Sequence, residues 1–178
     1  MFPMKMRTRK ARNNRSEEMM SSTSEWVPVA WRTVDLAAAL AGAPLFDGCA
    51  EREVASALTE FDDVRFPSGR RIVIEGPRGS DFFVVVTGTA AVLVDGWRVA
   101  TLGPGDFFGE IAILGDGVRS ASVRAEAPLH CLVLPNGKLE QLILDHPQVG
   151  INLIRAVIGR FRNVSGRRQP PAAELASA

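Results

Sequence analysis

The chain has 178 residues, 46% of them hydrophobic, with a formal net charge of +1 and only two cysteines. Its length suits one domain with tails, and two cysteines are too few for a disulfide framework, so we expect a reducing, cytoplasmic setting. No apolar run approaches the ~18 residues of a membrane-spanning helix, and no apolar segment follows the basic N-terminus, which argues against a secretory signal.

Charge is distributed unevenly along the chain. Residues 1–15 carry six basic residues and no acid, and residues 160–168 carry four arginines and no acid. Residues 16–159 hold 11 basic and 19 acidic residues. Basic ends on an acidic body favour solvated tails, and they also suit contacts with nucleic acid, an acidic partner or a membrane surface.

The predicted elements begin after a polar N-terminal segment. Residues 1–32 are predicted to be a disordered basic tail with a lead-in segment that contains Trp26 and Trp31. Residues 33–41 are predicted to be a helix that breaks at the following glycine and proline. Residues 50–61 space their apolar side chains at four and three, which predicts a second helix with one buried stripe.

From residue 64 the apolar pattern changes to short blocks that are typical of strands. Seven such runs are separated by turn residues: 64–66, 71–75, 82–88, 89–96, 97–103, 120–125 and 129–134. Asp95-Gly96 between two runs predicts a two-residue hairpin, because both central positions of that turn favour positive φ. Many short strands with tight turns predict a small antiparallel barrel or roll.

Helical periodicity returns at the end of the chain. Residues 137–146 are predicted to be a helix that stops at a proline, and residues 147–164 a longer helix. The apolar residues of the longer helix share one arc of a helical wheel: Ile154, Val157, Ile158, Phe161 and Val164. Arg160 borders this arc on one side, and Arg155 and Arg162 border it on the other. We expect the apolar face to dock on the roll or on a second copy of the chain.

These elements predict an α+β fold that is mainly β. It is an antiparallel β-roll, or jelly-roll barrel, flanked by N-terminal and C-terminal helices, with a short phosphate-binding helix inside the roll. The domain is predicted to span residues 33–164, followed by a loose C-terminal tail over residues 165–178.

One stretch inside the roll, FFGEIAILGDGVRSASVRA (residues 107–125), concentrates the polar chemistry. Gly109 lets the backbone approach a ligand closely, and the single helical turn EIAIL offers unpaired N–H groups to an anion. Arg119 can direct two donors to two phosphate oxygens. Ser120 and Ala121 are small enough to leave their N–H groups within reach.

Glu110 needs a different explanation, because a carboxylate beside a phosphate costs roughly 1 kcal/mol or more. An ionised carboxylate is a strong acceptor for a sugar hydroxyl. An acid for a hydroxyl and an arginine for a phosphate describe a site for a phosphorylated sugar. The alternative is that Glu110 and Arg119 pair with each other across the loop as a structural ion pair.

The stretch FGEIAILGDGVRSASVRA closely resembles the phosphate-binding cassette of the cyclic nucleotide-binding domain family. The resemblance extends through the helical lead-in LAGAPLFDG and the roll, over about residues 33–164. It implies that Glu110 accepts the ribose 2′-hydroxyl, that Arg119 binds the cyclic phosphate and that Gly109 permits close approach. It also implies that backbone amides assist: those of Ile111, Ala112, Ser120 and Ala121.

The purine contacts implied by the resemblance are less specific. Arg160 matches the position from which some channel-type members of the family place an arginine over the purine, and the alternative is an exposed helical arginine. Ser120 offers a hydroxyl directly after the arginine, as cAMP binders and cGMP binders both do. We expect cAMP as the ligand, with cGMP as the alternative.

The resemblance implies a stand-alone sensor that is not an enzyme and uses no cofactor. Only 14 residues follow Val164, so we expect no DNA-binding half. The signal is expected to leave through the C-terminal helix to a homodimer or a protein partner.

Three alternatives come from other classes of protein. A metal-dependent β-roll enzyme needs clustered histidine and carboxylate ligands, and only His130 and His146 are present, so no metal is expected. A nucleic-acid-binding regulator would use the basic tails, but aromatic residues do not interleave with them. A degenerate roll would keep the fold and bind no nucleotide.

Overall fold

The computed structural model describes residues 33–135 and 137–166. The predicted N-terminal tail and the predicted C-terminal tail beyond Gly166 lie outside the described residues.

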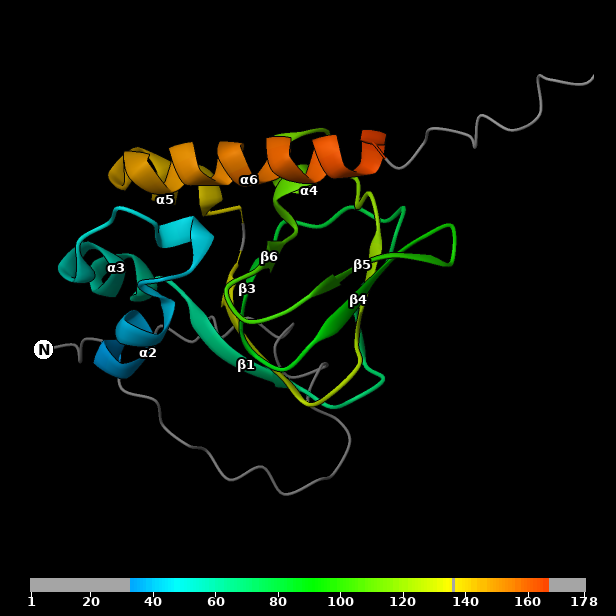
Figure 1. The fold of residues 1–178 in the computed structure, drawn as a ribbon, viewed down its shortest axis with the longest axis horizontal. Helices are drawn as coiled ribbons and strands as arrows, with labels where there is room; N and C mark the ends of the chain where they lie inside the picture. The colour runs from blue at the N-terminus through cyan, green and yellow to red at the C-terminus, as the bar shows by residue number, and fades with distance from the viewer. Residues whose placement is uncertain (1–32, 136, 167–178) are drawn as a thin grey trace, which may run out of the picture. The chain divides into compact units, whose positions relative to one another are not determined.

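The element order agrees with the predicted sequence of helices, roll and helices (Figure 1). Helices α2 (Thr33–Leu40) and α3 (Glu51–Leu58) flank the 3-10 turn η1 (Pro44–Phe46). The strands are β1 (Asp62–Phe66), β2 (Arg71–Val73), β3 (Phe82–Thr87), β4 (Ala90–Val94), β5 (Trp97–Leu102), β6 (Phe107–Phe108), β7 (Ser122–Ala125) and β8 (Leu129–Leu134). Helix α4 (Glu110–Leu114) lies between β6 and β7, and α5 (Leu139–Asp145) and α6 (Pro147–Gly166) follow the roll.

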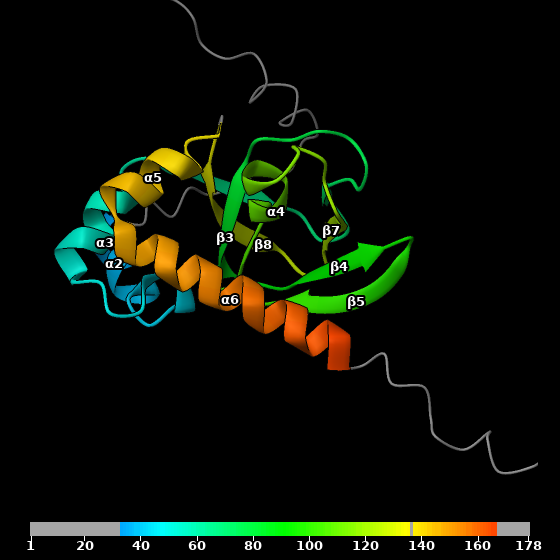
Figure 2. The same ribbon diagram turned by 90° about the horizontal axis from the view of Figure 1, so that it is seen from above.

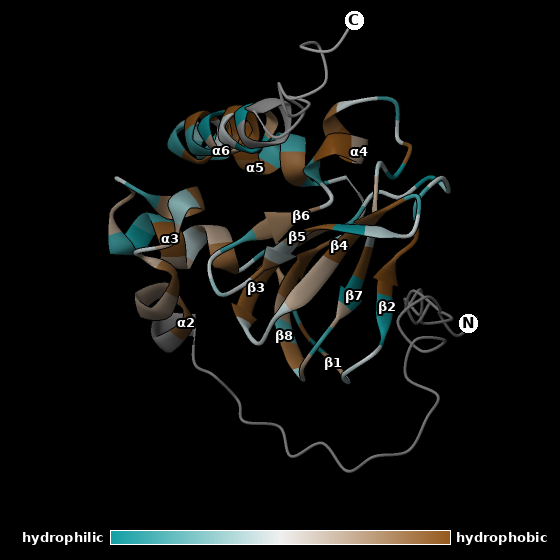
Figure 3. Ribbon diagram, turned by 45° about the vertical axis from the view of Figure 1, so that its right-hand side comes forward, coloured by the Kyte–Doolittle hydropathy of each residue, from teal (hydrophilic) through white to brown (hydrophobic). Residues whose placement is uncertain are grey.

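Two antiparallel four-stranded sheets, in the orders β1-β8-β3-β6 and β2-β7-β4-β5, form the predicted β-roll. The sheet that contains β3 is buried on both faces, and the side chains of β3 show how. Phe83 and Val85 face the second sheet, whereas Phe82 and Val84 alternate outward into a second core under the helices. A strand buried on both faces reads as the unbroken apolar run FFVVV, and Figure 3 shows this strand as hydrophobic along its length.

The local turn chemistry was predictable, but one short strand was not. Asp95 and Gly96 have φ of 51° and 80°, so the predicted two-residue hairpin between β4 and β5 is confirmed. Strand β6 was not predicted, because two residues carry no periodicity. It is fixed by pairing with β3, where the rings of Phe83 and Phe108 stack with centroids 4.6 Å apart.

Helix α6 lies on the same side of the roll as α4 and runs from α5 toward the β4–β5 hairpin (Figures 1 and 2). Its first half is tied to η1 by Asn152, which is buried. The Asn152 Nδ2 donates to the carbonyl oxygens of Leu45 (3.1 Å) and Asp47 (2.7 Å). The N-terminal half of α6 is therefore anchored to the helical lead-in by side-chain to backbone hydrogen bonds.

From Ile154 onward, three large apolar side chains of α6 point away from the roll. Ile154, Ile158 and Phe161 are 58%, 48% and 72% exposed, whereas Val157 packs against the core. Of the two expectations for this arc, docking on the roll is wrong for these three residues.

Among the helices of the described residues, none combines the length and the apolar character that a bilayer span requires.

Replacing Asn152 with Ala tests the anchor of α6. The change leaves two carbonyl groups without their donor, and we expect a loss of about 1–3 kcal/mol in the free energy of unfolding. Urea denaturation measures it. Gln148→Ala is the control, since Gln148 donates only one partly buried bond, to the Asn152 Oδ1. Equal effects of the two substitutions would contradict an anchor at Asn152.

Candidate functional site

The site is built where β6 turns into α4. Gly109 precedes the helix with φ of 96°, in the left-handed region that disfavours a side chain. A Cβ there would lie 2.5 Å from the Asp81 carbonyl oxygen and 2.7 Å from the Arg119 Nη1. Glycine is therefore required at this position by both the backbone conformation and the close approach of Arg119.

Arg119 is held by the backbone on both sides of its guanidinium. Its Nη1 donates to the Gly109 carbonyl oxygen at 3.0 Å and its Nη2 to the Asp81 carbonyl oxygen at 2.8 Å. The side chain is only 7% exposed. A Cβ at Gly79 would overlap the guanidinium, so a second glycine leaves room for it. These bonds fix the orientation of a buried cation.

Glu110, the first residue of α4, is 3% exposed. Its Oε1 accepts a hydrogen bond from the Arg160 Nη1 of α6 at 3.0 Å. The Arg160 guanidinium also lies over the Phe107 ring, 4.3 Å from its centroid, at a distance suited to a cation–π contact. Arg160 thus joins the second half of α6 to the β6–α4 corner.

Burial dominates the electrostatics of both charged groups. Desolvation raises the pKa of Glu110, and the charge and hydrogen bond of Arg160 oppose this rise, with a smaller contribution from Arg119. Desolvation likewise lowers the pKa of Arg119, and the carboxylates of Asp81 and Glu110 oppose it. The partners arranged around the carboxylate and the guanidinium offset part of the cost of burying the two charges but do not reverse the direction of either pKa shift.

Glu110 and Arg119 do not pair with each other, so the structural ion pair considered as an alternative is wrong. The ion-pair partner of Glu110 is Arg160, and Arg119 bonds to carbonyl groups. Of the other residues singled out from the sequence, Ala112 is buried, Ala121 is half-buried, and Ile111 and Ser120 are exposed. The structure therefore brings Gly109, Glu110, Arg119 and Arg160 together around one corner.

Sequence reasoning missed the turn that supports Arg119. Gly76 N–H donates to the Arg119 carbonyl oxygen at 2.9 Å, and Arg119 N–H donates to the Pro77 carbonyl oxygen at 3.2 Å. The glycines of EGPRGSD are a turn signal, but nothing in the sequence indicates which loop the turn lies against. Phe107 was missed for a related reason, because it reads as an ordinary core residue.

The corner can hold a ligand that carries both an anion and a hydroxyl group. A buried arginine with fixed geometry suits an anionic oxygen pair, and a buried carboxylate suits a hydroxyl donor. A metal centre is not suggested, since no group of three histidine, cysteine, aspartate or glutamate side chains gathers within the described residues.

Comparison with known proteins identifies the kind of domain. Residues 63–146 match the family model for the cyclic nucleotide-binding domain. A protein named cyclic AMP receptor protein from Thermus thermophilus is 35% identical over 126 residues, which cover 68% of this chain and 58% of that protein. A cGMP-dependent protein kinase from Toxoplasma gondii is 39% identical over 83 residues, which cover 47% of this chain and 8% of the kinase.

Solved structures agree with the sequence matches. The crystal structure of the Thermus thermophilus catabolite activator protein has a TM-score of 0.64 and 33% identity, over 70% of this chain and 61% of that one. This chain therefore spans less than two thirds of the length of each of these relatives.

Removing the partner of Glu110 should make stability depend more steeply on pH. The folded-state pKa of Glu110 is raised, so the stability it contributes is present at acid pH and is lost as the pH rises through that pKa. Arg160→Met should raise this pKa further. We expect a loss of about 1–3 kcal/mol at pH 7 and a smaller loss near pH 4, measured by urea denaturation. The control is Arg155→Met, on the exposed side of α6. A loss that is equal at both pH values would contradict this account of Glu110.

Proposed function

Because residues 63–146 belong to the cyclic nucleotide-binding domain family, we propose that this chain is a regulatory sensor that binds a cyclic nucleotide. We propose cAMP as its ligand. The likeness to a protein named cyclic AMP receptor protein supports this choice. The likeness to a cGMP-dependent kinase and the hydroxyl of Ser120 keep cGMP as the alternative.

One observation carries the proposal: an acid and an arginine are both buried at the β6–α4 corner without pairing with each other. In the proposed complex Glu110 accepts the ribose 2′-hydroxyl. A buried carboxylate gains more from a hydroxyl donor than an exposed one, because water does not compete for it.

The cyclic phosphate is proposed to bind at Arg119. The two carbonyl groups that hold the guanidinium engage two of its five N–H groups. Gly109 allows the ligand close to the backbone. The proposed amide donors come from the two ends of the cassette: Ile111, Ala112, Ser120 and Ala121.

Arg160 is proposed to link the ligand to α6. In this structure it pairs with Glu110 at 3.0 Å and lies over Phe107. A ribose hydroxyl would compete with Arg160 for the same carboxylate oxygens and free the guanidinium to lie over the purine. Binding would then change the position of the second half of α6. The two positions of this helix are in equilibrium, and the ligand shifts that equilibrium because it binds one of them more tightly.

The output is proposed to be regulatory and non-catalytic, in the cytoplasm. The exposed face of α6 is the proposed route to a homodimer or a protein partner. A nucleic-acid-binding regulator would use the basic ends of the chain. Residues 1–15 lie outside the described residues, and Arg160 of the C-terminal basic segment is engaged with Glu110.

Calorimetric titration of cAMP and of cGMP tests the proposal directly. We expect saturable binding, and we expect Arg119→Lys to weaken it by roughly 2 kcal/mol or more, because lysine cannot place two donors on two phosphate oxygens. The control is Arg124→Lys, an exposed arginine of β7. Absence of heat and of a thermal shift with both nucleotides at millimolar concentration would support the degenerate roll instead.

Gly79→Ala offers a second test that leaves every proposed ligand contact chemically intact. The added Cβ displaces the Arg119 guanidinium, so nucleotide affinity should fall about tenfold or more while the fold persists. Gly103→Ala is the matched control, since its added Cβ meets nothing within 4 Å. Unchanged affinity in Gly79→Ala, with a folded circular dichroism spectrum, would show that the position of Arg119 does not control binding.

A further inference from the structure

Exposed apolar side chains gather on the three helices around the proposed site. Of the ten large hydrophobic residues that are exposed in the described part of the chain, seven belong to α4, α5 and α6. They are Ile111 and Leu114 of α4, Leu144 of α5, and Ile151, Ile154, Ile158 and Phe161 of α6. We call this set the α4–α6 face. So large an exposed apolar surface is typical of an interaction site.

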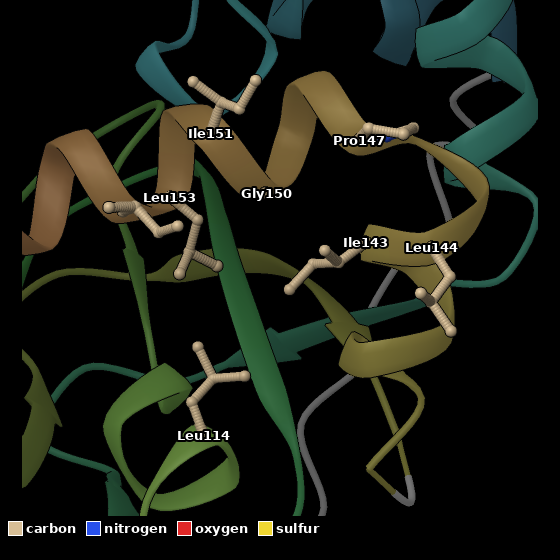
Figure 4. Close-up of a pocket in the computed structure, with 8 residues that line it drawn as sticks. Leu114, Ile143, Leu144, Pro147, Gly150, Ile151 and Leu153 are labelled. Carbon is tan, nitrogen blue, oxygen red and sulfur yellow. The ribbon is translucent and has the colours of Figure 1, made fainter.

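A groove joins the three helices into one surface. It has a volume of about 460 Å³, and Leu114, Leu144, Leu153 and Ile154 are among the side chains that line it. Figure 4 shows Leu114 rising from α4 toward Leu153 of α6, with Ile143 of α5 on the other side. An occupant of this groove would touch Leu114, the last residue of the short helix that begins with Glu110.

The apolar residues of α6 have the spacing of a helix-pairing seam. Ile151, Ile154, Ile158 and Phe161 follow each other at three, four and three residues, which is the a and d pattern of a heptad. They lie on the side of α6 that is turned away from its buried residues Val149 and Leu153. The occupant that fits such a seam is another helix with its own apolar stripe.

The charge of α6 decides which helix fits best. Residues 147–166 contain three arginines and no acid. Arg160 is engaged with Glu110, whereas Arg155 and Arg162 are exposed and lie one heptad apart along the same flank of the seam. A partner helix that carries carboxylates on that flank gains two ion pairs.

A second copy of the same helix offers no such carboxylates. In a parallel pair the e position of one helix meets the g position of the other, so Arg155 would face Gly150 and Arg162 would face Val157. In an antiparallel pair the arginines would face each other and repel. Charge complementarity therefore favours a different helix over a second α6.

We propose that the α4–α6 face binds an amphipathic helix of a partner protein, with an apolar stripe of heptad spacing and acidic residues along one flank. Because Ile111 and Leu114 belong to the same helix as Glu110, binding of this partner and of the nucleotide influence each other. This coupling rests on the proposed function, whereas the binding surface does not.

Two synthetic peptides test the surface without nucleotide. Both are three-heptad amphipathic helices with leucine at a and d, and the flanking positions are glutamate in one and lysine in the other. We expect the glutamate peptide to bind the full chain about tenfold or more tightly than the lysine peptide. In R155E/R162E this preference should reverse, and in I154A/F161A both peptides should lose affinity, while circular dichroism shows that both variants fold.

The other outcomes overturn the proposal. Equal affinity for the two peptides would mean that the arginines do not select the partner. A chain that sediments as a dimer, becomes monomeric in I154A/F161A and ignores both peptides would show that a second copy covers the face. Binding to vesicles of anionic phospholipid, with no binding to the glutamate peptide, would show a membrane surface instead.

Repeating the titration at saturating cAMP tests the coupling separately. The affinity for the glutamate peptide should change about fivefold or more. If cAMP binds alone but leaves peptide affinity unchanged, the coupling is wrong. If cAMP does not bind at all, the proposed function fails while the result for the surface stands.

Discussion

The corner depends on one buried cation, the guanidinium of Arg119. A charge that is buried away from solvent is tolerated only when hydrogen bonds from the protein replace those it made with water. The carbonyl oxygens of Gly109 and Asp81 supply those bonds, and glycine at positions 79 and 109 leaves the space. The path of the backbone from β6 into α4, and the turn before β3, are therefore both shaped around this side chain.

The second buried charge, Glu110, also needs a partner, and this requirement involves the last helix, α6. Its ionised form is costly without a cation nearby, and the cation comes from α6, 50 residues later. Asn152 fixes the first half of that helix to η1, and the pair with Arg160 ties the second half to the β6–α4 corner. A helix anchored at one end and held by one ion pair farther along is suited to respond to a ligand that competes for the carboxylate.

The apolar residues of α6 fall into two groups, one that packs against the rest of the domain and one that is exposed to solvent. Val149 and Leu153 are buried and attach the helix to its neighbours, whereas Ile154, Ile158 and Phe161 stay exposed. A wheel drawn from the sequence identifies apolar positions but does not identify which of them the fold uses. The face turned outward is the one that also carries Arg155 and Arg162, and so it combines apolar area with positive charge.

The sequence by itself determined the fold class, the hairpin at Asp95-Gly96, the order of helices and roll, and the presence of Glu110 and Arg119 in one short segment between two strands. These follow from local patterns: periodicity, turn residues and the spacing within one short segment. Only the tertiary structure decided that Glu110 pairs with Arg160, that the turn before β3 supports Arg119, and that the apolar arc of α6 faces outward. Such contacts join residues 38 to 50 positions apart, and their geometry is set by how the layers pack, which no local pattern records.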